Sequence, residues 1–263
     1  MPSIRWLGSE LLYLDEPHVE RCGDVAIGCY GGNTSAGAER NEDAAVVVVE
    51  EAWRFAAVLD AHVTAESAAI VVGELELRMP EFTHLLDGPP GEAFEALRAS
   101  LLQWFTSTAF RRAADGVSGE TALLLCVEKA GFLFWFSVGD CLVYLLHPEL
   151  AALGQFTLNQ RSFYEWVGKQ DSLALEAPAF SSGVKQLRGG NNRVLLATDG
   201  LFEDSGLRSS DARAIYEAFA TSGDDEQVVK ALLTGVHEAR GRDSATLIAW
   251  TAEGPPQALQ PSR

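Results

Sequence analysis

The feature that most constrains the fold is a pair of apolar runs, 44–49 and 53–59, separated by only three residues. Runs of this length with a short polar break are typical of two antiparallel strands joined by a tight turn. In such a hairpin Asp43 and Asp60 lie directly opposite each other, with side chains about 5 Å apart on one face. Carboxylates at that distance repel each other unless one is protonated or a cation lies between them. The pair therefore predicts a bound cation; the alternative is two polar strand ends that face water.

Two further aspartates stand at the ends of apolar runs elsewhere in the chain. Asp199 directly follows the run at 193–198, and Asp243 directly precedes the run at 244–250. Four aspartates at strand ends can meet at one sheet edge, and carboxylate oxygens favour Mg²⁺ or Mn²⁺ over zinc. The sequence has no cysteine and histidine pairs at zinc-binding spacing. The pattern therefore predicts a divalent metal site built from acidic side chains.

The order of the apolar patterns indicates the fold class. Strands are predicted at 25–31, 44–49, 53–59, 121–128, 131–138, 141–147, 193–198 and 244–250. Apolar residues at helical spacing predict helices at 64–79, 91–113, 211–221 and 225–239, the last one starting at Asp224. Strands and helices do not alternate strictly, so antiparallel sheets covered by helices are expected rather than a doubly wound parallel sheet. The prediction is a layered α+β domain.

The acidic composition limits the partners of the chain. Its 263 residues carry a formal net charge of -17, and the sequence pI is about 4.6. Such a chain repels nucleic-acid phosphates and anionic lipid, so we expect neither nucleic acid nor membrane as a partner. Any phosphate group that the protein handles needs cations to screen the acidic side chains, and metal ions are the obvious candidates.

The cysteines and the N-terminus favour a cytoplasmic location. The four cysteines form no CxxC pair and lie mostly in apolar runs, which is typical of reduced, partly buried thiols. No apolar run is long enough to span a membrane, and the N-terminal residues lack the pattern of a signal peptide. A cytoplasmic monomer is the expectation.

Six short motifs follow one another along the chain: RNEDA at 40–44, VLDAH at 58–62, GETALLL at 119–125, SVGDCLVYLL at 137–146, LLATDGLFE at 195–203 and RDSATLIAW at 242–250. In this order they resemble the motifs of the metal-dependent type 2C serine/threonine protein phosphatases, a family also found widely in bacteria. The resemblance implies a four-layer αββα sandwich, in which two antiparallel sheets are flanked by helix pairs. It would cover residues 1–253, with 149–192 as a flap-like excursion and 254–263 as a C-terminal tail.

The resemblance also implies a centre of two Mn²⁺ or Mg²⁺ ions, held by Glu42, Asp43, Asp60, the carbonyl of Ala61, Asp199 and Asp243. Asp60 would bridge both ions, and Asp140 matches the position of a third, weaker metal in bacterial relatives. A water shared by two divalent ions loses a proton near neutral pH and attacks the phosphorus of a phosphoserine or phosphothreonine. His62 matches the family's proposed general acid for the departing oxygen.

The chain departs from the family pattern around the bridging aspartate. Ala61 and the pair Val63-Thr64 stand where the family has glycines, and alanine does not easily adopt a positive φ. Cys141-Leu142 stands where many relatives carry Ser-Arg, and Ser244 stands where asparagine is common. These changes affect substrate contacts and the surroundings of the metal, whereas all the aspartates are kept.

The arginine that usually holds the substrate phosphate is replaced by Ala38. Arg40 lies two residues further on, about 7 Å along an extended segment and on the same face. Arg40 either takes over phosphate binding or is an exposed charge beside acidic neighbours. The aromatic segment 163–166 either steers substrate choice or packs as part of a surface subdomain.

Three functions are consistent with these residues. The leading one is a metal-dependent phosphatase that acts on a phosphorylated protein. The second is a module of the same fold that binds a partner or a phosphoprotein with little or no turnover, which the loss of arginine at Ala38 favours. The third is hydrolysis of a small phosphorylated metabolite at the same centre.

Overall fold

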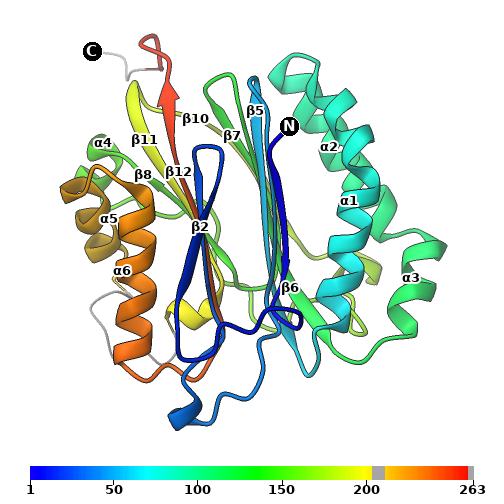
Figure 1. Cartoon of the computed structure of the whole chain (residues 1–263). Helices are drawn as coiled ribbons and strands as arrows, with labels where there is room; N and C mark the ends of the chain where they lie inside the picture. Colours follow the sequence, from blue (N-terminus) through cyan, green and yellow to red (C-terminus); the bar gives the residue numbers. More distant parts are fainter. Residues whose placement is uncertain (203–210, 260–263) are drawn as a thin grey trace.

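The computed structural model describes residues 1–202 and 211–259. Two antiparallel sheets pack face to face, and helices cover the outer face of each sheet (Figure 1). The molecule is therefore the α+β sandwich of four layers that the motifs indicated.

Sheet A carries the predicted hairpin. Its strand order is β1 (Ser3–Leu7), β4 (Ala44–Val49), β5 (Trp53–His62), β6 (Glu120–Lys129), β7 (Phe132–Val138) and β10 (Ser181–Gln186), with β9 (Val167–Gly168) paired to β6. Ala44 pairs with Leu59, so the next position in the same register places Asp43 beside Asp60. This confirms the predicted register.

Sheet B and the helices complete the layers. The strand order of sheet B is β2 (His18–Cys22), β3 (Val25–Tyr30), β12 (Ala245–Gly254), β11 (Gly190–Ala197) and β8 (Leu142–Leu146). The α-helices among the described residues are α1 (Glu66–Leu86), α2 (Pro90–Phe105), α3 (Thr108–Asp115), α4 (Pro148–Ala152), α5 (Ala212–Thr221) and α6 (Asp225–Glu238). Short 3-10 helices lie at Thr34–Ala36, Ser172–Ala174 and Asp199–Leu201.

Most strands of the two sheets are apolar because both of their faces are buried. In β5, Val58 points into the layer between the sheets, where it belongs to one core with Trp250, whereas Leu59 points outward into the core beneath α1. Full burial of each such side chain stabilises the fold by about 1.5–3 kcal/mol. On sheet B, α6 lies so close to β3 that a Cβ at Gly28 would stand 2.3 Å from Val229. Both sheets are thus fixed between apolar layers, with their strand ends free to carry polar groups.

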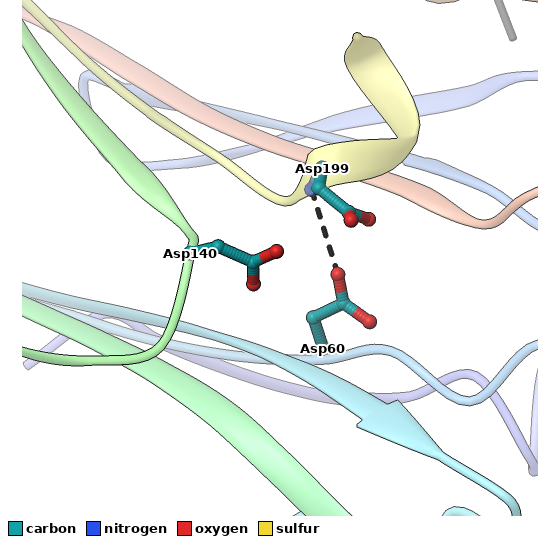
Figure 2. A group of neighbouring side chains, drawn as sticks. All are labelled: Asp60, Asp140 and Asp199. Carbon is teal, nitrogen blue, oxygen red and sulfur yellow. Dashed lines mark hydrogen bonds between the residues drawn. The ribbon is translucent and has the colours of Figure 1, made fainter. Parts of the chain in front are cut away.

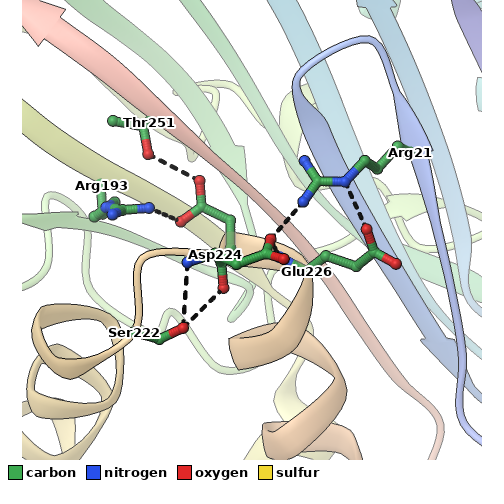
Figure 3. Close-up of polar contacts among 7 residues, drawn as sticks. Arg21, Arg193, Ser222, Asp224, Glu226 and Thr251 are labelled. Carbon is green, nitrogen blue, oxygen red and sulfur yellow. Dashed lines mark hydrogen bonds and ion pairs between the residues drawn. The ribbon is translucent and has the colours of Figure 1, made fainter.

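A cluster of charged residues fixes the start of α6 (Figure 3). Asp224 caps the helix by accepting a hydrogen bond from the Glu226 amide, which confirms the predicted helix start. Arg21 of β2 pairs with Asp224 and Glu226. Asp225 pairs with Arg193 of β11 and accepts a hydrogen bond from Thr251 of β12 at 2.9 Å. Three strands are therefore connected to the helix at one end of sheet B.

The structure corrects parts of the predicted element list. The helix predicted at 91–113 is two helices, because the side chain of Ser107 accepts a hydrogen bond from the Phe110 amide and starts α3 there. The strands β1, β2, β9 and β10 were not predicted. Segment 149–192 contains α4 and β10, and β10 pairs with β7 at the edge of sheet A.

The C-terminal residues that the structure describes contact sheet A. Ala258 is buried, and the Leu259 amide donates a hydrogen bond to the Gln186 side chain at 3.0 Å. Residues 260–263 of the predicted tail, and Glu203 of the motif at 195–203, lie outside the described residues. Within residues 1–202 and 211–259, no helix is long and apolar enough to cross a bilayer.

Candidate metal centre

Three aspartates from different parts of the chain meet at one end of the sandwich. Asp60 belongs to β5, Asp140 lies between β7 and β8, and Asp199 follows β11. Each offers a carboxylate oxygen within 4.8 Å of the others. Figure 2 shows the three side chains around a common space, and the Asp199 amide lies 3.5 Å from Oδ2 of Asp60. The strand ends therefore form a group of oxygen donors suited to a metal ion.

The electrostatics of this group favour a bound cation. Asp60 and Asp199 are each only 4% exposed. Burial raises the pKa of Asp60 well above its ordinary value, and the neighbouring Asp43 carboxylate raises it further. Burial and the Asp60 carboxylate likewise raise the pKa of Asp199. Among the described residues, Oδ1 of Asp199 has no hydrogen-bond partner. Because unpaired buried carboxylate oxygens are costly, a hard divalent ion such as Mg²⁺ or Mn²⁺ fits this donor set.

Asp43 lies beside this group but is held by hydroxyl groups. Its Oδ2 accepts hydrogen bonds from Thr198 at 2.9 Å and from Thr246 at 2.6 Å. Burial raises the pKa of Asp43 to about 8. Thr246 belongs to β12 and Thr198 directly follows β11, so the Asp43 side chain joins the two sheets at this end. Neither threonine was singled out in the sequence, since both lie inside or next to apolar strands.

Glu42 and Asp243 line a cavity next to the three aspartates. The cavity has a volume of about 580 Å³, and Ala38, Arg40 and Arg242 also line it. Glu42 Oε1 has no hydrogen-bond partner among the described residues, and burial raises the pKa of this carboxyl. The Asp243 carboxylate lies outside the group of three but contributes to the raised pKa of Asp60. Three of the predicted ligands, Asp60, Asp140 and Asp199, thus form one group. Two others, Glu42 and Asp243, line the cavity.

Arg40 extends along the rim of this cavity. Its Nε lies 3.2 Å from Oε2 of Glu42, and its Nη1 donates a hydrogen bond to the Val63 carbonyl at 2.8 Å. The side chain is 64% exposed, and the buried Ala38 lines the same cavity. Arg40 is therefore placed where it can contact a group bound in the cavity.

The residues after Asp60 continue β5. Ala61 pairs with Thr121 and His62 with Glu120. Ala61 is not among the described residues with positive φ, so this strand conformation requires no glycine at position 61. The positive φ occurs instead at Val63, where it is 75°. A β-branched residue in this conformation is strained, by about 1–3 kcal/mol.

We expect Val63→Gly to stabilise the protein by about 1 kcal/mol, because strain relief exceeds the backbone entropy that glycine loses on folding. The Val63 side chain is 58% exposed, so the substitution removes little packing. Urea unfolding measures the change, and Val63→Ala, which keeps a Cβ, is the matched control with a smaller gain. A lower free energy of unfolding for Val63→Gly would show that the side-chain contacts outweigh the strain.

Arg161 is the charged residue at the centre that the sequence did not indicate. Its Nη2 lies 3.1 Å from Oδ2 of Asp140 and 3.0 Å from Oδ2 of Asp199. Arg161 lies in segment 149–192, whose weak periodicity gave no reason to bring it to the aspartates. The centre thus contains a cation supplied by the chain itself.

No protein-family model matches the chain, and no curated protein matches it. Solved structures do match. One is a bacterial serine phosphatase carrying a single substitution, with 16% identity, a TM-score of 0.67, and coverage of 90% of this chain and 100% of that one. The serine/threonine phosphatase Stp1 from Staphylococcus aureus shares 16% identity with a TM-score of 0.64, over 88% of this chain and 95% of its own.

A third similar structure is RsbX in complex with magnesium. It has 11% identity and a TM-score of 0.59, and the match covers 90% of this chain and 100% of that chain. In each case nearly the whole length of both chains is matched. The chain therefore has the fold of the bacterial type 2C serine/threonine phosphatases.

Proposed function

We propose that the protein is a metal-dependent phosphatase that hydrolyses phosphoserine and phosphothreonine in proteins. The observation that carries the proposal is the meeting of Asp60, Asp140 and Asp199 at the strand ends of a phosphatase fold. Asp60 and Asp199 are buried, the pKa of each carboxyl is raised, and Oδ1 of Asp199 has no hydrogen-bond partner among the described residues, as expected for side chains that need a cation. The similar RsbX structure contains magnesium, which supports a divalent ion here.

Several residues of the chain would hold two Mn²⁺ or Mg²⁺ ions. Asp60 would lie between them, with Asp199 and Asp243 on one ion and the Ala61 carbonyl on the other. Glu42 and Asp43 would bind or orient these ligands, and Asp140 would serve a third ion. Two such ions supply a water of lowered pKa and screen the charge of the phosphate.

The remaining side chains act on the substrate. Arg40 lies on the rim of the 580 Å³ cavity, where a phosphoryl group would enter. His62, two residues after Asp60 at the end of β5, would donate a proton to the departing serine or threonine oxygen. The cavity is bordered by acidic residues, so the metals and Arg40 together would offset the repulsion of an anionic substrate.

Hydrolysis of p-nitrophenyl phosphate and of phosphopeptides, with and without millimolar Mn²⁺, tests the proposal. We expect turnover that requires the metal and disappears in Asp199→Asn. Turnover that chelation leaves unchanged would contradict the proposal. Metal binding without turnover would support the hypothesis of a partner-binding module instead. The buried Ala38, at the position where the family usually has arginine, favours that hypothesis. Hydrolysis of phosphorylated metabolites but not of phosphopeptides would assign a small-molecule substrate.

We further propose that the protein acts in the cytoplasm, as a monomer, on phosphorylated proteins. The four cysteines are free and buried, which is consistent with a reducing compartment. Its likeness to bacterial serine/threonine phosphatases supports a phosphoprotein substrate.

A further inference from the structure

Arg161 occupies a position between two of the three aspartates. One nitrogen of its guanidinium, Nη2, donates to both Asp140 and Asp199, at 3.1 Å and 3.0 Å. The guanidinium also lies 4.7 Å from the ring centre of Phe163 and 5.9 Å from that of Phe202. Its side chain is 23% exposed. The arginine is therefore held by charge and by aromatic contacts at the carboxylate group itself.

We propose that Arg161 is a built-in counter-cation that competes with divalent metal for Asp140 and Asp199, so that metal binding releases the segment 160–166 from the site. The inference rests on the proposed metal centre and adds a regulatory contact to it. Without a bound ion, the guanidinium would neutralise the charge of Asp140 and Asp199 and inhibit metal binding at this site.

The competition follows from the shared carboxylate groups. Arg161 bonds Oδ2 of Asp140 and Oδ2 of Asp199, and the group of three places donor oxygens of these residues within 4.8 Å of one another. An arginine does not lose its proton in proteins, so it cannot become neutral beside a metal ion. Two cations near the same carboxylates repel each other, and the arginine has to move away. The apparent dissociation constant for the metal is then the intrinsic one divided by the fraction of molecules in which Arg161 is away.

The segment that carries Arg161 is anchored on both sides. The buried Asn159 side chain donates to Ser137 and to the Cys141 carbonyl, and accepts from the Val143 amide. At the other side, Val167 pairs with Thr121 in sheet A. These anchors do not involve the contacts of Arg161 with the aspartates.

Between the anchors, few backbone interactions oppose a movement. Residues 160–166 form no helix or strand, and the Ser162 amide donates to the Gly139 carbonyl at 3.1 Å. At the second anchor, the Trp166 amide donates to the Ser172 hydroxyl at 2.9 Å, and the Trp166 carbonyl accepts from the Ser172 amide at 2.8 Å. Tyr164 has a positive φ of 67° and is 85% exposed. Arg161 can therefore leave the aspartates by a local rearrangement that keeps the sheets intact.

Calorimetric titration of Mn²⁺ into the wild type and Arg161→Ala tests the competition without any need for turnover. We expect the variant to bind Mn²⁺ about tenfold more tightly, which corresponds to about 1.4 kcal/mol. Arg161→Gln, which keeps the length of the side chain, is expected to show the same direction. The matched control is Arg193→Ala, because Arg193 is 20% exposed and also pairs with a buried aspartate, but at the start of α6. This control should leave Mn²⁺ affinity unchanged.

Hydrogen exchange of the peptide 160–166 provides a second readout. In the wild type we expect Mn²⁺ to increase exchange in this peptide, whereas in Arg161→Ala exchange is already high without metal. Mn²⁺ binding that is measurable in Arg161→Ala but not in the wild type would also support the competition.

Equal or weaker Mn²⁺ affinity in both Arg161 variants would overturn the inference and leave the metal-dependent phosphatase standing. Wild-type exchange that falls on Mn²⁺ addition would overturn it as well, because the segment would then close on the metal. Absence of Mn²⁺ binding in the wild type and in both Arg161 variants would overturn the inference and the proposed function together.

Discussion

Replacing Asp60 with asparagine is expected to lower Mn²⁺-dependent hydrolysis of p-nitrophenyl phosphate by at least about 10³-fold, or about 4 kcal/mol of transition-state stabilisation. Asp60 is the aspartate on a central strand of sheet A, and it lies within reach of both Asp140 and Asp199. An amide keeps the size of the side chain but offers only one neutral oxygen, so it cannot bridge two divalent ions. Initial rates at saturating Mn²⁺ measure the loss.

The same substitution is expected to stabilise the metal-free protein. Burial and the nearby Asp43 carboxylate make the charged form of Asp60 unfavourable, and a neutral amide removes both effects. In chelator, urea unfolding should therefore give a higher free energy of unfolding for Asp60→Asn than for the wild type. Activity and stability thus change in opposite directions, as expected for a residue kept for its chemistry rather than for the fold.

Glu128→Gln is the matched control for this experiment. Glu128 is a buried carboxylate on β6 with a raised pKa, but it pairs with Arg54 at the opposite end of the same sheet. Its replacement should leave Mn²⁺-dependent turnover intact. Turnover in Asp60→Asn within tenfold of the wild type would show that Asp60 does not bridge the metals.

Binding of Mn²⁺ is expected to raise the melting temperature by about 5–10 °C at an ion concentration about 100 times the dissociation constant. At one fixed Mn²⁺ concentration, the increase should be larger near pH 8 than near pH 5, because the metal binds the deprotonated carboxylates more tightly. The pKa of Asp43 is raised to about 8, and those of Asp60 and Asp199 are raised as well, above the unfolded value of about 3.9. Calorimetry at the two pH values, with Mn²⁺ or with chelator, measures the shifts.

The sign follows from proton binding. Without metal these three carboxyls bind more protons in the folded protein than in the unfolded chain between about pH 4 and pH 8, so their contribution to stability falls as pH rises through this window. Metal binding requires deprotonated carboxylates and therefore opposes that loss most strongly at high pH. Asp199→Asn should lose most of the Mn²⁺ effect at both pH values. An increase that is larger near pH 5 would contradict the assignment of these carboxylates as ligands.

Much of the fold was predictable because strand and helix patterns in this chain are long and apolar. The hairpin register followed from the distance of Asp43 and Asp60 from a common turn, and the structure confirms it. The strands β1 and β2 were not predicted because they are short and carry exposed charged residues, such as Arg5 and Arg21, beside buried ones. The break between α2 and α3 depends on the single cap of Ser107 within an otherwise helical pattern.

The candidate site was predictable as far as its acidic residues mark strand ends. Asp60 and Asp199 each directly follow an apolar run, and the structure brings them together with Asp140, although β5 continues past Asp60 to His62. Thr198 and Thr246 are polar residues inside or beside buried strands, where only the packing of the two sheets shows that they reach Asp43. Arg161 lies in a segment without periodicity, and it meets residues 21 and 38 positions away in the chain. No local pattern determines such contacts.

The bonds of Asp43 to the two threonines have a consequence for the order of folding. They join residues that are 155 and 203 positions apart in the chain. Thr246 belongs to β12, the last strand, which lies in the middle of sheet B and pairs with both β3 and β11. Sheet B therefore cannot close before β12 inserts, and contacts of such long range form slowly. During synthesis on the ribosome, sheet A and its helices can assemble early, while the end of the sandwich that carries the aspartates is completed only when β12 has been made.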